Sequence, residues 1–414
     1  MPTPMTHAPT PPAPSAFVPF DPKRVRPARS VAELRERAAR LLPEIAAGAA
    51  ARERDRVMPY EWVRRIADEG LYTFRVPERY GGAGGTVRDL IRFVIDVAAV
   101  DSNVAQSLRP GFGFIESLLW ANNADVYARW LPRVQAGEIF GNAGWERGGP
   151  NGQITARLTR DGDHYRVSGT KYYSTGALYA DWVSSFALDD DGKEVSFVVP
   201  RDRPGLQLVD DFDAMGQRLT ASGTTVFDRV EVRPDELRPP MARDRRTPIP
   251  ALYQLFLAAV EAGIAKNAFS DAVHFTQHFA RPIKHSSATR SVDDPYVQES
   301  VGQIAANAYA ADAVVIKAAD AIDRAWAGGL SNELLTTAAI EVAQAQFFAV
   351  QAALKASELL FDVGGATTTS REHNLDRHWR NARTVANHNP RQWKAAAVGN
   401  YHLTGAQPPT TGLF

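Results

Sequence analysis

The chain has 414 residues, and its 47 lysines and arginines balance its 47 aspartates and glutamates, so it has no net field to attract nucleic acid or a membrane surface. It contains no cysteine, which excludes disulfides, thiolate nucleophiles and cysteine-based metal sites. No apolar run approaches the ~18–20 residues needed to cross a bilayer and no basic-then-apolar leader opens the chain, so we expect a cytoplasmic protein without nucleic-acid or membrane partners.

The first part of the chain divides into an arm and a helical domain. Residues 1–29 contain nine prolines, a density that disfavours helix and sheet alike, so we interpret them as a flexible arm. Ser30 and Glu33 form a capping box that opens a helix extending to about Arg54. Further helical patterns cover residues 60–69, 87–99, 104–120 and 124–136. Together they predict an N-terminal helical domain over residues 30–137.

The pattern changes near residue 138. Short alternating segments, separated by turns such as Asp161-Gly162, predict an all-β domain over residues 138–241. Ala-rich helical patterns then return at residues 250–279, 295–327, 332–360 and 384–402, and predict close helix packing in a C-terminal domain over residues 242–414. The expected fold class is therefore α+β and mostly helical.

Residues 375–394 combine four arginines, two histidines and two tryptophans. Three of the arginines recur at every third position and would share one helical face: Arg377, Arg380 and Arg383. The residues that follow, Asn387 to Pro390, are a turn signal, because a proline biases the residue before it away from helix. On that turn, His388 could combine contact with an anionic ligand and acid–base work. The alternative is an ion-paired or solvated surface, as basic helix faces usually are.

The sequence shows no fingerprint of a metal or nicotinamide site. The HxxxH spacing of His274 and His278 lacks a third ligand. The glycines within residues 81–85 lack G-x-G-x-x-G spacing and follow no strand. We therefore expect no metal and no bound nicotinamide cofactor.

Several segments resemble the flavin-dependent monooxygenases built on the acyl-CoA dehydrogenase fold, of the dibenzothiophene monooxygenase type, with the related sulfur-acquisition oxidoreductases. These segments are LDRHWRNART…HNP…K…VG…HLTG from residue 375, VPERYGG at residues 76–82, GTKYYSTGA at 169–177 and FARPI at 279–283. The resemblance spans residues 30–405. It implies an N-terminal helical domain, a middle β-barrel and a C-terminal four-helix bundle, assembled as a homotetramer that is a dimer of dimers.

The resemblance implies a flavin site built from two segments of the β domain. The loop at residues 140–146 is expected to lie along the flavin, since small residues let a backbone approach a planar ligand closely. Read without the resemblance, it is an ordinary loop at the start of a strand. In the segment 169–177, the hydroxyls of Ser174 and Thr175 would donate to flavin N5 or to a peroxide oxygen, where the alternative is a half-buried strand. The predicted flavin contacts here are Asn142, Ala143, Gly144, Trp145 and Thr175.

The same resemblance favours FMN over FAD as the cofactor. Acyl-CoA dehydrogenases carry an arginine for the FAD pyrophosphate at the position of Thr276. Arg281 instead matches an arginine that meets the FMN phosphate, which guanidinium groups bind bidentately, and it would come from a neighbouring subunit. A second phosphate-contacting arginine of the relatives falls at about Thr367, in a threonine-rich loop that could still donate hydrogen bonds. Thr367, Thr368 and Asn389 complete the predicted cofactor set.

The general bases of acyl-CoA dehydrogenases are missing from this chain. Alignment places Asn389 on the usual glutamate and Tyr253 near the alternative base, and an amide cannot abstract the α-proton of a thioester. His388 matches the C-terminal active-site histidine of the monooxygenases. In residues 101–114, Gln106 and Pro110 replace a histidine and a tyrosine of the relatives, so the substrate pocket differs. Its predicted lining is Gln106, Phe112, Phe114 and Trp145; the alternative for the phenylalanines is core packing.

These features predict an FMNH2-dependent monooxygenase that uses O2 through a flavin C4a-hydroperoxide to oxygenate a small aromatic or organosulfur compound. A separate NAD(P)H:flavin reductase would supply the reduced flavin. His388 is expected to deliver a proton or hydrogen bond to the peroxide, with Thr175, Ser174 and Asn142 as the other catalytic residues. The alternatives are an FAD-dependent acyl-CoA dehydrogenase or oxidase with a relocated base, and a non-catalytic flavin-binding or scaffold protein.

Overall fold

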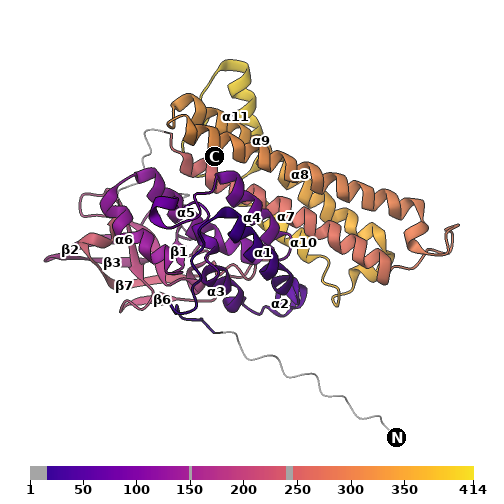
Figure 1. Ribbon diagram of the computed structural model, residues 1–414, viewed down its shortest axis with the longest axis horizontal. Coiled ribbons are helices and arrows are strands. Elements are labelled where there is room, and N and C mark those ends of the chain that lie inside the picture. The colour runs from indigo at the N-terminus through magenta and orange to yellow at the C-terminus, as the bar shows by residue number, and fades with distance from the viewer. Residues whose placement is uncertain (1–15, 149–151, 239–245) are drawn as a thin grey trace, which may run out of the picture.

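The computed structural model of the protein describes residues 16–148, 152–238 and 246–414 (Figure 1). The first fifteen residues of the predicted arm lie outside this range. Residues 16–29 differ from the predicted flexible arm, because they lie against the N-terminal domain. Arg64 donates to the Val18 carbonyl at 3.2 Å and Arg37 donates to the Pro27 carbonyl at 3.0 Å. Prolines lack an N–H but keep a carbonyl oxygen, so these arginine side chains supply the donors that the segment can use.

Helices form the N-terminal domain, as predicted. They are α1 (Val31–Ala46), α2 (Ala49–Asp55), α3 (Tyr60–Asp68), α4 (Val87–Ala98), α5 (Ser102–Ala121) and α6 (Ala124–Gln135). The side chain of Ser30 accepts a hydrogen bond from the N–H of Glu33 and caps α1. The helix predicted to reach Arg54 breaks between α1 and α2, where Gly48 adopts a left-handed φ of 77°.

The middle domain is a single sheet with its own hydrophobic core. Its strands are β1 (Phe140–Ala143), β2 (Arg157–Asp161), β3 (His164–Lys171), β4 (Trp182–Leu188), β5 (Glu194–Pro200), β6 (Leu206–Leu208), β7 (Thr225–Val232) and β8 (Leu237–Arg238). The strand order is β6-β7-β3-β2-β4-β5-β8, and β1 pairs in parallel with β4, which places Asn142 opposite Ser184. Val167, Val183, Phe197 and Phe227 pack inside. Inward alternation of such residues is what the sequence pattern predicts.

The C-terminal domain is a bundle of long helices with two shorter ones. They are α7 (Pro248–His278), α8 (Pro295–Ala327), α9 (Asn332–Leu359), α10 (Arg377–Ala386) and α11 (Arg391–Thr404). The helix predicted at 384–402 is two helices, because the turn signal at Asn387 to Pro390 ends α10 and begins α11. Figure 1 shows the sheet and the long bundle on opposite sides of the N-terminal helices.

Helix α7 lies at the centre of the molecule. It packs on α8 and α9 in the bundle and on α4 and α5 of the N-terminal domain. Among the described helices it alone is long and apolar enough to span a membrane, with a mean hydropathy of 1.4 in its most apolar window. That window is an exception to the expectation of no such segment, but 94% of it is buried, as in a core helix. Helix α7 therefore joins the C-terminal bundle to the N-terminal domain.

Candidate active site

Two predicted motifs of the β domain lie side by side. The N–H of Asn142 donates to the Thr175 carbonyl at 3.2 Å, and the N–H of Gly144 donates to the Tyr173 carbonyl at 3.3 Å. A Cβ on Gly144 would lie 3.3 Å from that Tyr173 oxygen, a tight contact that favours glycine at this position. The Oδ1 atom of Asn142 is buried and has no hydrogen-bond partner among the described residues. The Asn142 oxygen is therefore free to accept a hydrogen bond, and the loop backbone beside it carries no bulky side chain. Both features suit a planar heterocycle that carries N–H groups.

A chain of buried hydroxyls determines whether the Thr175 hydroxyl can donate or accept a further hydrogen bond. Thr220 donates to the Gln217 carbonyl at 2.9 Å, which uses its only hydrogen. The hydrogen between Thr220 and Ser222, whose oxygens are 2.7 Å apart, must therefore belong to Ser222. By the same reasoning Thr175 donates to Ser222 across 3.0 Å. Thr175 is thus left as an acceptor, whereas the sequence analysis expected a donor. Neither Thr220 nor Ser222 was singled out there, because no local pattern links them to Thr175.

Ser174, which precedes Thr175, is only 1% exposed. It accepts a hydrogen bond from Thr225 at 2.8 Å. Ala143 is fully buried, and its carbonyl accepts from Ser185 at 2.8 Å. Trp145 is 38% exposed and packs edge-to-face on Phe186. Ser174 and Ala143 are therefore buried residues that stabilise the loop. Thr175, Asn142 and Trp145 are the side chains that we expect to contact a ligand.

His388 belongs to an exposed turn, but its ring is partly buried and faces Gln106 of α5. Its Nδ1 donates to the Val385 carbonyl at 3.1 Å, so Nε2 is the free acceptor, and the Gln106 amide lies 3.4 Å from it. Burial of the ring and the positive charge of Arg109 lower the pKa of His388 well below its usual value. The imidazole is therefore neutral at pH 7, which favours the hydrogen-bonding role over proton delivery by a charged ring.

Asn389 and the end of the chain share one hydrogen-bond hub at Gln254 of α7. The Asn389 amide donates to Gln254 Oε1 at 2.7 Å, and Asn389 is only 7% exposed. It therefore anchors the turn that carries His388, and little of its surface is accessible to a cofactor. Lys394 Nζ reaches the same oxygen at 3.2 Å and the Leu413 carbonyl at 2.8 Å. Gln254 in turn donates to the Gly412 carbonyl at 2.6 Å. The C-terminal tail thus folds back onto the support of His388.

The predicted phosphate ligands lie at the other end of α7. Gln254 and Phe279 are 25 positions apart, roughly 37 Å at ~1.5 Å per residue. The threonine-rich loop is at the Phe279 end, where Phe279 contacts His373 and Gly364 adjoins Phe275. FMN is far shorter than this distance, so one FMN cannot contact both His388 and Arg281 of the same chain.

The individual phosphate ligands differ in availability. Arg281 is exposed and makes no ion pair or hydrogen bond within the described ranges. Thr367 is also exposed. Thr368 is buried, and its hydroxyl donates to the Gly365 carbonyl at 2.6 Å. The Thr368 side chain is therefore committed to its own turn, and Arg281 and Thr367 remain open to a ligand.

The basic face of α10 is largely ion-paired. Arg377 and His378 both reach Asp271 of α7, at 2.6 and 2.8 Å. Arg380 forms bidentate hydrogen bonds with the buried Glu53 at 2.6 and 3.1 Å. These three side chains are therefore ion-paired, which was the alternative to a ligand-binding role for this helix. They fasten α10 to α7 and α2 and so place the His388 turn.

A small cavity opens beside Asn142. It has a volume of about 110 Å³. Its walls include Phe114, Trp120, Asn142, Ser184, Arg238 and Tyr253. Gly113 makes room for Tyr253, because a Cβ there would lie 2.3 Å from the Tyr253 hydroxyl. Phe114 lines this cavity, Phe112 packs in the core against Tyr72 and Phe256, and neither Gln106 nor Trp145 is among the lining residues.

Arg238 and Arg109 were not predicted from the sequence. Arg238 ends the short strand β8 and lines the small cavity. Arg109 lies over the ring of Tyr253 at 5.5 Å. Arg109 falls inside residues 101–114, a segment already considered for the substrate pocket, so its position was a usable signal. Arg238 has no local signal, because only the fold brings β8 to α5.

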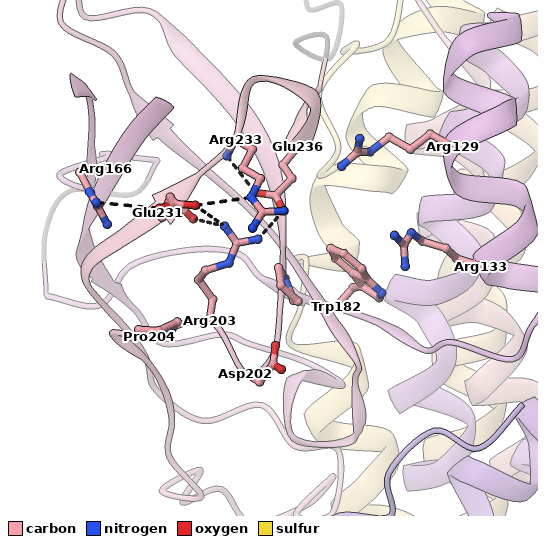
Figure 2. Close-up of a pocket in the computed structure, with 11 residues that line it drawn as sticks. Arg129, Arg133, Arg166, Trp182, Asp202, Arg203, Pro204, Glu231, Arg233 and Glu236 are labelled. Carbon is pink, nitrogen blue, oxygen red and sulfur yellow. Dashed lines mark hydrogen bonds and ion pairs between the residues drawn. The ribbon is translucent and has the colours of Figure 1, made fainter. Parts of the chain in front are cut away.

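A larger cavity of about 430 Å³ lies between α6 and the sheet, and Figure 2 shows its lining. It contains none of the predicted site residues. Its arginines are ion-paired: Arg203 pairs with Glu231 and Glu236, and Arg233 also reaches Glu231 at 3.4 Å (Figure 2). Arg129 and Arg133 pair with Asp235 and Glu138, which lie outside the lining. We therefore place the chemistry at the smaller cavity. Across the described residues, no cluster of three or more His, Asp or Glu side chains is arranged to hold a metal ion.

Comparison with known proteins gives three family matches. Residues 30–138 match the acyl-CoA dehydrogenase N-terminal domain, residues 147–230 the middle domain, and residues 255–393 the C-terminal domain. The chain is 32% identical to a dibenzothiophene monooxygenase of Mycolicibacterium goodii over 82% of this chain and 86% of that one. It is 30% identical to the probable FMNH2-dependent monooxygenase SfnC of Pseudomonas putida over 83% and 88%. The crystal structure of FMN-bound TdsC from Paenibacillus sp. A11-2 superposes with a TM-score of 0.84, at 27% identity, over 91% of this chain and all of that one.

Proposed function

The chain belongs to the acyl-CoA dehydrogenase family, and from this premise we propose that it is an FMN-dependent monooxygenase that transfers one oxygen atom from O2 to a small organosulfur or aromatic compound. The observation that carries the proposal is the absence of a carboxylate among the described residues lining the cavity beside Asn142. A dehydrogenase needs a carboxylate base there. Glu261 of α7 is fully buried and does not line the cavity, and burial raises its pKa well above the usual value. The FAD-dependent dehydrogenase alternative is therefore disfavoured.

The residues around the loop 140–146 fit reduced FMN. Thr175 is an acceptor, and reduced flavin carries an N–H at N5 that oxidised flavin lacks. Asn142 Oδ1 is a second unused acceptor. When bound, FMN supplies the oxygen chemistry, and the protein supplies orientation and exclusion of water. The C4a-hydroperoxide route and the supply of FMNH2 by a separate reductase are part of this proposal, as is a cytoplasmic location, which export of a tagged chain would contradict.

We also propose that each site is shared between two chains of a homotetramer. The separation of His388 and Arg281 along α7 supports it, because only a second copy could bring an Arg281 to the phosphate. The exposed and unpaired state of Arg281 is consistent with such a role. Sedimentation that found a monomer binding FMN at full strength would contradict the shared site.

Replacing Ser222 by alanine should lower the midpoint potential of bound FMN by about 20 mV. Without Ser222, Thr175 can turn its hydrogen toward the flavin and stabilise the oxidised N5, an effect of about 1 kcal/mol for one hydrogen bond, where ~30 mV corresponds to ~1.4 kcal/mol for two electrons. The measurement is a spectroelectrochemical titration. Ser196→Ala is the matched control, because Ser196 lines the cavity outside the hydroxyl chain. An unchanged or raised potential in Ser222→Ala would contradict the acceptor assignment.

The function itself is tested with photoreduced FMN and ¹⁸O2. We expect one ¹⁸O atom in the product of an organosulfur substrate and the second in water. Substituting photoreduced FAD should lower the yield at equal concentration. Bleaching of bound flavin by an acyl-CoA, with no labelled product from organosulfur or aromatic compounds, would instead establish the dehydrogenase alternative.

A further inference from the structure

Tyr253 of α7 lies between two arginines at the small cavity beside Asn142. Its ring packs on Gly113 of α5, where a Cβ would lie 2.3 Å from the Tyr253 hydroxyl. The guanidinium carbon of Arg109, one turn earlier on the same face of α5, lies 5.5 Å from the centre of the Tyr253 ring. Arg238 of β8 lines the cavity together with Tyr253. Elements from three domains therefore meet at this one phenol.

Neither of these arginines has an acidic partner. No carboxylate in the described part of the chain interacts with Arg109 or Arg238, and burial lowers the pKa of both. Arginine nevertheless keeps its positive charge at pH 7. Other buried arginines are paired, as Arg64 is with Asp181. An unpaired buried cation is costly, so two such charges beside one phenol require an explanation.

The two charges act on the ionisation of Tyr253. Burial raises the pKa of its hydroxyl above the ordinary value, and the positive charges of Arg109 and Arg238 oppose that rise. The phenol is therefore protonated at pH 7, and its hydroxyl has no hydrogen-bond partner within the described ranges. When the hydroxyl loses its proton, the two fixed cations stabilise the phenolate that remains. The arrangement suits a proton donor.

The rest of the cavity lining offers no other acid. Apart from Tyr253, its described polar groups are serine hydroxyls, the Asn142 amide and the Arg238 guanidinium, which do not give up protons at ordinary pH. Asn142 Oδ1, the Thr175 hydroxyl and His388 Nε2 are hydrogen-bond acceptors. Transfer of one oxygen atom from O2 needs an acid, because the other oxygen atom leaves as water.

We propose that Tyr253 is the catalytic acid of the oxygenation: its hydroxyl protonates the oxygen atom that leaves as water, and Arg109 and Arg238 stabilise the resulting phenolate. The proposal rests on the monooxygenase function above and assigns a further catalytic residue to it. With X as the substrate, the reaction balances as X + O2 + FMNH2 → XO + H2O + FMN. The bond from X to oxygen forms and the O–O bond breaks. X and FMNH2 each lose two electrons, which the two oxygen atoms take up. The two hydrogens of FMNH2 end in the water, so Tyr253 recovers the proton that it lends.

The electrostatic part is tested without flavin or turnover, by a ¹⁹F NMR titration of the full chain labelled with 3-fluorotyrosine. The signal of residue 253 is the one that Tyr253→Phe lacks. Arg238→Met and Arg109→Met should each raise the pKa of this phenol by about 1. Arg238→Lys should change that pKa less, since lysine keeps a positive charge. Arg40→Met is the matched control, because Arg40 is an exposed arginine of α1.

The catalytic part is tested by single-turnover oxygenation of an organosulfur compound with photoreduced FMN. Tyr253→Phe keeps the ring but lacks the proton, so it should lower the oxygenation rate by about two orders of magnitude. Hydrogen peroxide should be released instead, by FMNH2 + O2 → FMN + H2O2. The matched control is Tyr309→Phe, because Tyr309 of α8 is 79% exposed. The acid must be protonated to act, so activity should be lost at lower pH in the fluorotyrosine enzyme, whose phenols are more acidic.

The proposal is overturned if Tyr253→Phe keeps the wild-type oxygenation rate and releases no additional hydrogen peroxide. It is also overturned if both methionine variants leave the phenol pKa unchanged. Circular dichroism confirms that each variant is folded. A wild-type enzyme that oxygenates no compound would remove the proposed function and the catalytic role with it, whereas the NMR titration would still show whether the two arginines stabilise the phenolate.

Discussion

Replacing His388 by alanine should lower the oxygenation rate at pH 7 by about two orders of magnitude, the scale of a lost acid–base or hydrogen-bonding group. The chain holds this imidazole in one tautomer, through the Val385 carbonyl, and offers Nε2 toward Gln106 and the site. The measurement is single-turnover oxygenation with photoreduced FMN. The matched control is His402→Ala, since His402 is an exposed histidine on the neighbouring helix α11. A His388→Ala enzyme with the wild-type rate would remove His388 from the mechanism.

The pH dependence has a defined sign. Because burial and Arg109 depress the pKa of His388, the ring stays neutral below its usual titration range, and activity should fall only at pH values well under 6.5. Arg109→Met removes one depressing charge, so the acid limb of the rate profile should move to higher pH. An NMR titration of the His388 ring protons follows the same pKa without turnover. A limb that moves to lower pH in Arg109→Met would contradict the assignment.

A mixing experiment connects His388 to the proposed sharing of sites. Chains carrying His388→Ala and chains carrying Arg281→Ala are each expected to be weakly active. Dissociated and reassembled together, they should regain a substantial part of the activity, because some sites then combine an intact His388 with an intact Arg281 from the other chain. If well-mixed assemblies regain no activity, one chain supplies both His388 and Arg281 to a site.

Replacing Asp181 by asparagine should lower the free energy of unfolding by about 3–5 kcal/mol, as expected when one partner of a buried ion pair is removed. Arg64 is 2% exposed and donates to both carboxylate oxygens of Asp181, at 2.9 and 2.8 Å. Asp181 also accepts from the N–H of Ile139 at 2.7 Å, directly before β1. The pair therefore fastens α3 to the strand that carries Asn142. Urea unfolding at fixed chain concentration measures the loss.

The control for this change is Asp320→Asn. Asp320 pairs with Arg88 at 2.6 Å, but the side chains are 38% and 52% exposed, and exposed pairs contribute only ~0–1 kcal/mol. A double variant, Arg64→Met with Asp181→Leu, should recover much of the stability, because no unpaired charge remains. Equal losses in Asp181→Asn and Asp320→Asn would show that burial of the Arg64 pair contributes nothing.

Local patterns in the sequence were sufficient for the domain order and for most elements. The capping box at Ser30, the alternating strands and the turn at Pro390 each depend on a few neighbouring residues. Sequence motifs also brought out the family, and with it FMN as the cofactor to consider. The loss of carboxylates at Asn389 and Tyr253 was readable as well, because it concerns residue identity at aligned positions.

Only the tertiary structure decided which partner each side chain contacts. Thr175 became an acceptor through Ser222 and Thr220, which lie some 45 positions further along the chain. Asn389 became an anchor through Gln254, and Arg238 lines the cavity only because β8 meets α5. A hydrogen-bond direction or an unpaired charge depends on contacts between distant segments, and these contacts leave no periodic trace in the sequence. For that reason the sequence determined which chemistry to expect, and the fold determined which atoms are free to perform it.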